Sequence, residues 1–119
     1  MNELIFIILA FISSTSIIST DCVFRKDAFD NIRYRCDGET GYLREDVFGK
    51  VTDSRSNISW KKDVFDNIRS SDGKVWRLDT FGNFVSNEGD RWHKDAFGSW
   101  LSNKGIYCRE DVFENFRCR

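Results

Sequence analysis

The stretch from Trp76 to Trp92 reads WRLDTFGNFVSNEGDRW, and it decides the fold because the pattern begun at its first residue starts again at its last. Asp79 with Phe81 forms an Asp-x-Phe motif that returns 16 residues later at Asp95 with Phe97. Along the chain the motif occurs six times, with its Asp at positions 27, 46, 63, 79, 95 and 111. Such a regular period predicts a tandem repeat architecture.

Three columns of equivalent positions accompany the motif. The position three residues before the Asp is apolar in every copy and holds Phe24, Leu43, Trp60, Trp76, Trp92 and Cys108. The position five residues after the Asp is also apolar in every copy and holds Ile32, Val51, Ile68, Phe84, Trp100 and Phe116. A third column, two residues before the Asp, holds Arg25, Arg44, Lys61, Arg77, His93 and Arg109. Since side chains alternate between the faces of a strand, the apolar columns are expected on one face and the basic column on the other.

Each copy contains two turn signals. The first is the Asp-x-Phe element itself, and the second is a step ending in glycine, as in Ser71-Asp72-Gly73 and Asn87-Glu88-Gly89. Two turns in a 16-residue period leave two short strands per copy. A three-residue loop with Gly in the left-handed conformation predicts that Ile68 faces Trp76, that Phe84 faces Trp92 and that Trp100 faces Cys108.

The four cysteines provide an independent test of the first turn. Cys22 and Cys36 are equally distant from Phe29, and Cys108 and Cys118 are equally distant from Phe113. A hairpin folded at each Phe brings the members of a pair together, so we predict disulfides Cys22–Cys36 and Cys108–Cys118. The alternative connectivity joins the first copy to the last and closes a ring. Either connectivity fits an oxidising compartment.

The predicted fold class is therefore all-β, with tandem 16-residue repeats forming an antiparallel meander that curls into a sheet or barrel. One aromatic face cannot stay exposed on a flat sheet in water. A two-sided β-solenoid is the alternative, because stacked coils also align equivalent positions.

The N-terminus has a different composition. Leu4 to Ile12 form an apolar run of signal-peptide length, which is too short to span a bilayer. We predict a signal peptide over residues 1–19 and a six-copy repeat domain over residues 20–119, secreted to an extracellular or periplasmic location. Without the leader the basic and acidic residues are equal in number, 18 of each. This balance argues against nucleic acid and acidic membranes as partners.

Two columns are candidates for chemistry. The Asp of the motif, with Asp66 and Asn67 near Asp63, resembles a set of calcium ligands, but copies four and five have Gly82 and Gly98 in place of the second acid. We therefore expect the Asp to cap the turn, and we expect no metal and no cofactor. The indoles of Trp60, Trp76, Trp92 and Trp100 are candidates for stacking on a ligand, but their place on one apolar face favours a role in the hydrophobic core.

No nucleophile, base and orienting group come together in the pattern, because His93 belongs to the basic column and the cysteines are expected to be oxidised. The loops Asp37 to Gly41 and Thr52 to Ile58 break the repeat and are the place to look for a special site. The sequence thus favours a secreted, non-catalytic binding module for a glycan, an envelope component or an extracellular protein. The alternative is a structural, protective or inhibitor protein. A membrane partner is expected only if the leader is not cleaved.

Overall fold

The structure is a computed structural model in which residues 2–14, 21–29, 31–112 and 115–119 are described. These residues form one helix, α1 (Asn2–Ser14), and twelve strands. The strands are β1 (Cys22–Lys26), β2 (Ile32–Cys36), β3 (Glu39–Glu45), β4 (Val51–Asp53), β5 (Ser59–Lys62), β6 (Ile68–Ser70), β7 (Val75–Leu78), β8 (Phe84–Ser86), β9 (Arg91–Lys94), β10 (Trp100–Ser102), β11 (Tyr107–Glu110) and β12 (Phe116–Cys118).

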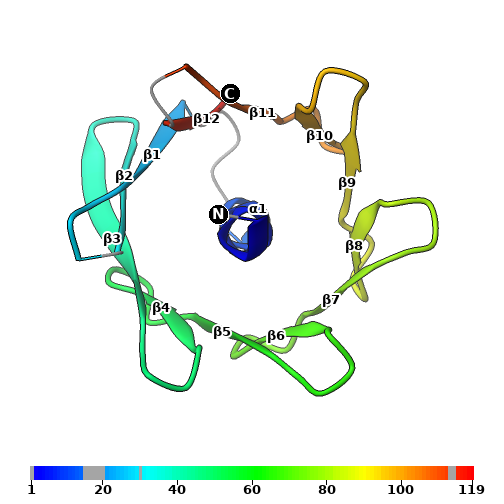
Figure 1. Cartoon of the computed structure of the whole chain (residues 1–119), viewed down its shortest axis with the longest axis horizontal. Coiled ribbons are helices and arrows are strands. Elements are labelled where there is room, and N and C mark those ends of the chain that lie inside the picture. Colours follow the sequence, from blue (N-terminus) through cyan, green and yellow to red (C-terminus); the bar gives the residue numbers. More distant parts are fainter. Residues whose placement is uncertain (1, 15–20, 30, 113–114) are drawn as a thin grey trace.

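The twelve strands form a closed antiparallel barrel (Figure 1). Each strand pairs with the next along the chain, and β1 pairs with β12 to close the ring. The predicted all-β meander is confirmed in its barrel form. The β-solenoid alternative is wrong, because neighbouring strands run antiparallel and are joined by tight turns at alternating ends.

The hairpin registers follow from the turns. Ile68 is opposite Trp76, Phe84 is opposite Trp92, and Trp100 is opposite Cys108, as predicted from the glycine steps. Gly73 takes a φ of 100° at the end of its step, a left-handed conformation that glycine adopts without a steric penalty. Both predicted disulfides are also confirmed, Cys22–Cys36 within the β1–β2 hairpin and Cys108–Cys118 within the β11–β12 hairpin.

The interior of the barrel is apolar and the outer wall is charged. Both apolar columns point inward and are buried, whereas the basic column is exposed along its whole length. Small side chains accompany the large indoles: Trp60 is opposite Ser70, Trp76 is opposite Ser86, and Trp92 is opposite Ser102. This alternation lets the wide aromatic rings pack without overlap.

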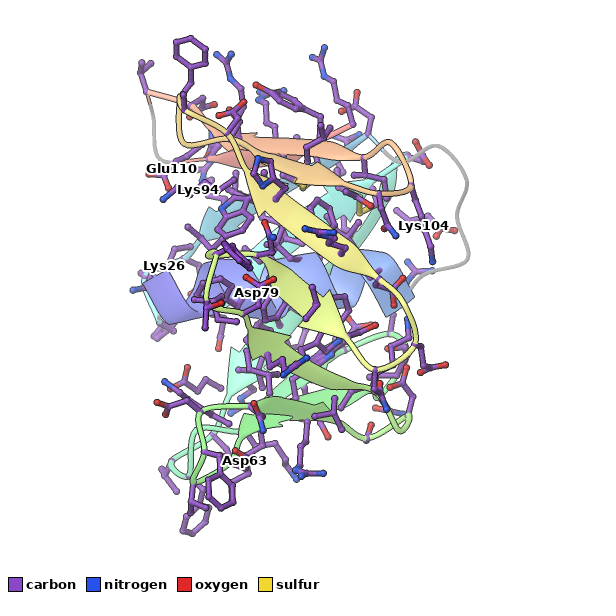
Figure 2. All side chains as sticks on the ribbon, turned by 90° about the vertical axis from the view of Figure 1, so that its right-hand side faces the viewer. Lys26, Asp63, Asp79, Lys94, Lys104 and Glu110 are labelled. Carbon is purple, nitrogen blue, oxygen red and sulfur yellow. A yellow bond between two sulfur atoms is a disulfide. The ribbon has the colours of Figure 1, made fainter. Side chains whose placement is uncertain are left out.

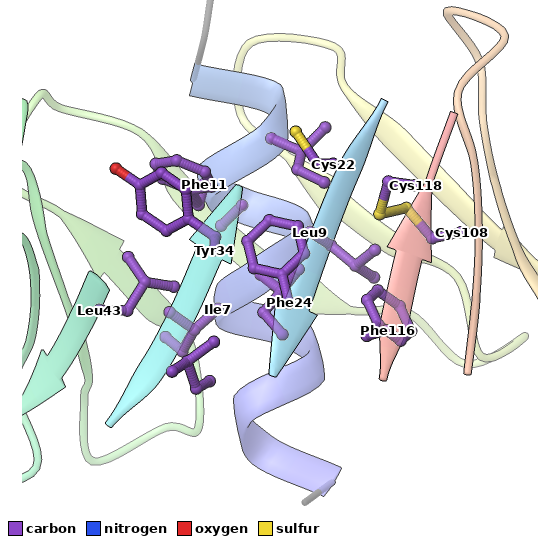
Figure 3. Packing of buried hydrophobic residues seen from close by; sticks show 14 of the residues in the cluster. Ile7, Leu9, Phe11, Cys22, Phe24, Tyr34, Leu43, Cys108, Phe116 and Cys118 are labelled. Carbon is purple, nitrogen blue, oxygen red and sulfur yellow. A yellow bond between two sulfur atoms is a disulfide. The ribbon is translucent and has the colours of Figure 1, made fainter. Parts of the chain in front are cut away.

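Helix α1 runs through the centre of the ring (Figure 1). Its residues Ile7 to Ile12 are between 0 and 7% exposed. An eight-stranded barrel is just narrow enough for wall side chains to fill it, so a twelve-stranded barrel has room for more. Because α1 is apolar on all sides, it fills this space without burying an unpaired charge. Figure 3 shows Ile7, Leu9 and Phe11 packed against the wall side chains Phe24 and Tyr34.

The helix contains most of the segment that the sequence predicts to be a signal peptide. The region around Ser19 and Thr20, where cleavage is expected, lies outside the described residues. The predicted boundary between residues 1–19 and 20–119 therefore stays a prediction. Within the full chain, the apolar run belongs to the same buried cluster as the barrel wall.

Candidate binding surfaces

The two ends of the barrel have opposite character. In an antiparallel meander successive turns alternate between ends, so all Asp-x-Phe turns lie at one end and all glycine steps lie at the other. Figure 2 shows the first end with Lys26, Asp63, Asp79, Lys94 and Glu110, and the second end with Lys104. Polar residues and glycine form the turns at the second end, which we call the polar rim.

The first end presents a ring of phenylalanines, which we call the Phe rim. Five motif phenylalanines are described, and their exposed fractions are 84% for Phe29, 78% for Phe48, 79% for Phe65, 87% for Phe81 and 93% for Phe97. Phe113 lies outside the described residues. The residue before the Phe is also apolar in several turns, with Val47, Val64 and Val112 at least 90% exposed. The rings lie on separate turns, but the exposure of large apolar side chains at the same place in each described turn marks a candidate interaction surface.

The Asp of each motif builds the turn. Asp79 accepts hydrogen bonds through Oδ1 from the backbone N–H groups of Phe81 at 2.9 Å and Asn83 at 2.8 Å. In the same way, Asp63 Oδ1 accepts hydrogen bonds from the backbone N–H groups of Phe65 and Asn67. Its Oδ2 accepts a hydrogen bond from Arg69 Nε at 2.9 Å. The predicted capping role is confirmed.

These bonds also perturb the carboxyl groups. The backbone N–H of Asn83 is the main cause of a lowered pKa at Asp79, and desolvation opposes it only in part. At Asp63 desolvation is the largest influence and raises the pKa, but the backbone bonds and Arg69 together lower it below the ordinary value. The carboxylates are therefore held in their charged form by the turn itself.

The phenyl ring takes no part in this turn. The hydrogen bonds use the backbone N–H of the Phe, and its ring points into solvent. Sequence reasoning used these phenylalanines only to locate the turn and missed them as surface residues. A signal was available, because Gly, Asn, Asp and Ser are the usual residues at turns, and a Phe at the tip is out of place there.

Charges around the Phe rim are mixed in sign. Basic Lys26, Lys62 and Lys94 occupy the position before the motif Asp in three turns, and Glu45 and Glu110 occupy it in two others. Ion pairs tie the outer wall to the motif acids, as between Arg33 and Asp27 at 3.0 Å. The Phe rim therefore has no strong field of one sign.

The four tryptophans proposed as stacking platforms lie inside the barrel. Trp76 and Trp92 are fully buried, Trp60 is 1% exposed and Trp100 is 5% exposed. Phe6 and Phe11 of α1 contact this wall, with ring centroids 5.7 Å apart for Phe6 and Trp100 and 6.1 Å apart for Phe11 and Trp60. The four indoles therefore belong to the core of the full chain, as the period-two pattern favours, and they are not exposed platforms.

Polar groups meet the helix at one end of the lumen. Ser13 Oγ accepts from Trp92 Nε1 at 2.8 Å, and the carbonyl oxygen of Ser13 accepts from Lys74 Nζ at 3.3 Å. Lys74 and Lys104 both pair with the buried Asp90, at 2.9 and 2.8 Å. Burial raises the pKa of Asp90, but the hydrogen bonds from Lys104, Lys74 and Ser86 outweigh it and lower the pKa.

At the opposite mouth, beside the Phe rim, a pocket of about 520 Å³ opens between the helix and the wall. Phe6, Phe48, Phe65 and Phe84 are among its lining residues. The lumen is thus reached from the apolar end, and its polar contacts lie at the other end.

The irregular loops of the first two copies enclose a buried polar pair. Tyr34 donates to Asp53 Oδ1 at 2.6 Å, and Asp53 Oδ2 accepts from the hydroxyl and the backbone N–H of Ser56. Burial and the neighbouring carboxylate raise the pKa of Tyr34 far above its usual range. Gly41 lies under the Tyr34 ring, where a Cβ atom would be 2.4 Å from the ring. These loops hold Tyr34 in the lumen, and their residues Thr40, Gly41 and Ser54 line an open hollow of about 980 Å³ together with Arg33 and Arg35.

Among the described residues, no nucleophile, base and orienting group lie together as a catalytic centre. His93 is exposed on the outer wall with its Nδ1 2.9 Å from Asn83 Oδ1, and all four cysteines are in disulfides. In the same ranges, no three His, Cys, Asp or Glu side chains gather as a metal site. The described helix is not long and apolar enough to cross a membrane. Comparison of the chain with models of protein families, with curated proteins and with solved structures gave no match.

Proposed function

We propose that this protein is a secreted, non-catalytic binding module that docks through its Phe rim on a phospholipid bilayer. The observation that carries the proposal is the exposure of the motif Phe at the same place in every described Asp-x-Phe turn. The two disulfides fit an oxidising compartment, and the apolar N-terminal run fits export through a cleaved leader.

The shape of the Phe rim supports a flat partner. The turns that carry the rings lie at one end of a closed barrel, so they meet a plane together instead of surrounding a small ligand. At the turn tips Phe48 and Phe65 are preceded by the exposed Val47 and Val64, which extend the apolar area that such a plane would cover. Among the predicted partner classes, an envelope component fits these side chains best. The exposed phenylalanines favour a lipid surface, which replaces the sequence-based expectation that a membrane partner requires an uncleaved leader.

The energetics are sufficient for reversible binding. Full burial of one Phe side chain in an apolar phase contributes about 1.5–3 kcal/mol, and several rings enter the interface together. Because basic and acidic side chains both surround the Phe rim, binding does not require anionic lipid. Affinity for zwitterionic vesicles is expected to depend little on salt.

Flotation with phosphatidylcholine vesicles tests the proposal. Replacing two rim rings in the variant Phe81→Ser/Phe97→Ser is expected to weaken vesicle binding by at least about tenfold, from the apolar area removed. The matched control is Tyr42→Ser/Leu101→Ser, which removes two exposed apolar side chains from the barrel wall. This control is expected to bind like the wild type.

Equal binding by the rim variant and the wild type would refute the proposal. So would a rim variant and a wall variant that lose binding to the same extent. If the wild type does not bind vesicles but forms dimers that the rim variant does not form, the structural or protective alternative replaces the membrane role.

A further inference from the structure

Removal of α1 with the leader would leave the lumen of the mature protein open to a ligand. This inference rests on the removal of the leader, which is part of the function proposed above, and it concerns a different surface from the Phe rim. Within the full chain Ile7 to Ile12 of the helix are buried in the lumen, and Ile8 to Ala10 are at most 1% exposed. Cleavage would expose the wall side chains that these residues cover.

The vacated space is long and apolar. Thirteen helical residues span about 20 Å, and a helix with its side chains is about 10–12 Å across. Indoles and phenyl rings line this path, among them Trp76 and Phe84, which stack with centroids 4.7 Å apart. An occupant that replaces the helix must therefore present a long apolar body to these rings.

The polar end of the lumen specifies the head of the occupant. Asp90 is buried and pairs with both the largely buried Lys74 and the exposed Lys104, so these three groups together carry one positive charge in excess. In the full chain Lys74 Nζ donates to the Ser13 carbonyl at the C-terminal end of α1, which is the negative end of the helix dipole. Trp92 Nε1 donates to Ser13 Oγ beside it. An anionic head with two acceptor oxygens satisfies the same two donors.

Two further donors have no partner. The indole nitrogens of Trp60 and Trp76 are buried and form no hydrogen bond in the structure. A buried N–H without an acceptor is costly, so an apolar helix satisfies the lumen only in part. These donors offer additional contacts to oxygen atoms or water carried in with a ligand.

We infer that the lumen of the mature chain binds a long-chain fatty acid anion. Its carboxylate lies between Lys74 and Trp92 at the polar end, and its acyl chain follows the path of α1 toward the Phe rim. The pocket beside Phe6 and Phe48 marks the entrance at that end.

Quenching by dibrominated stearate separates this site from the Phe rim. Bromine quenches indole fluorescence on contact, and all four tryptophans line the lumen, whereas the Phe rim carries none. The secreted chain, with leader removal verified by intact mass and lipid removed beforehand, is expected to show saturable quenching that unlabelled stearate reverses. Native mass spectrometry then gives the number of bound chains.

Variants of two lysines test the head position. Lys74→Gln is expected to weaken stearate binding by roughly tenfold or more, because a hydrogen bond to a charged group is lost. Lys50→Gln is the control: it removes the same charge, but Lys50 is exposed and belongs to the Asp46 turn at the opposite end of the barrel. The control is expected to retain most of the affinity.

Several results would overturn the inference. They are a secreted chain that retains residues 2–14, a leaderless chain that shows no saturable quenching, and equal losses for the two lysine variants. A leaderless chain that is unfolded with and without stearate, as measured by circular dichroism, would also overturn it. Vesicle flotation reports on the Phe rim alone, so the failure of either proposal is recognised separately.

Discussion

Cys22 and Cys118 lie directly opposite each other across the junction of β1 and β12, yet each is bonded to a cysteine on its other side. The four cysteines thus occupy adjacent strands in the order Cys108, Cys118, Cys22 and Cys36. The disulfides stabilise the first and last hairpins but do not cross the junction. Strand pairing over three residue pairs joins the two ends of the barrel, together with an ion pair between Arg119 and Asp21 at 3.9 Å.

The first prediction concerns this junction. In the variant Cys36→Ser/Cys108→Ser the two remaining cysteines are expected to form a Cys22–Cys118 disulfide, because directly opposed residues lie within bonding distance. In the matched control Cys22→Ser/Cys118→Ser, the remaining Cys36 and Cys108 are three strand spacings apart, about 14 Å. No intramolecular bond is expected there. Non-reducing peptide mapping distinguishes the products, and free thiols in the first variant would contradict the closed ring.

Much of the fold could be predicted from the sequence because its signals are local. The turn centre fixes the register of a hairpin, so the pairing of Ile68 with Trp76 and the bond between Cys108 and Cys118 follow from counting residues. Inward and outward faces follow from alternation, as the buried Trp92 and the exposed His93 show.

The remaining features depend on long-range contacts. Closure of β1 on β12 is set by the accumulated twist and tilt of twelve strands, which no single copy encodes. The position of α1 in the lumen follows from that closure, since its apolar surface suits a leader and a buried core helix equally. The exposed ring of Phe81 was missed because its column was interpreted only as a turn marker.

The second prediction concerns the core. In the full chain, with α1 in the lumen, Trp76 is fully buried and stacks on Phe84. Trp76→Ala in that chain is expected to lower the free energy of unfolding by about 3–5 kcal/mol through lost contacts and a cavity. Leu101→Ala on the outer wall is the control and is expected to change it by less than about 0.5 kcal/mol. Urea unfolding measures both. Similar losses at the two sites would mean that the indole is not part of a packed core.

The third prediction concerns the close approach of Gly41 to Tyr34. A Cβ atom at position 41 would be 2.4 Å from Tyr34 Cζ, so Gly41→Ala is expected to destabilise the protein by about 1–3 kcal/mol. Combining it with Tyr34→Val removes the clash, so the double variant is expected to lose less than the sum of the single losses. A double-mutant cycle from urea unfolding measures this coupling. Additive losses would show that the two residues do not touch.

The fourth prediction concerns acid. The pKa values of Asp27, Asp46, Asp63 and Asp79 are lowered in the folded chain, chiefly through hydrogen bonds from backbone N–H groups that outweigh desolvation. At pH values near and below the ordinary Asp pKa of 3.8, the unfolded chain therefore binds more protons than the folded chain. The stabilisation that these carboxylates contribute is complete above that pH. The free energy of unfolding is expected to fall as the pH drops through the lowered pKa values.

Asp79→Asn isolates one contribution to this acid sensitivity. The side-chain oxygen of the Asn still accepts hydrogen bonds from the N–H groups of Phe81 and Asn83, so the turn is kept. Because the amide does not titrate, the melting temperature of the variant is expected to depend less steeply on pH below about 4. Melting temperatures measured by circular dichroism between neutral and acid pH give the two slopes. An unchanged slope in the variant would show that capping of the turn is not linked to protonation of Asp79.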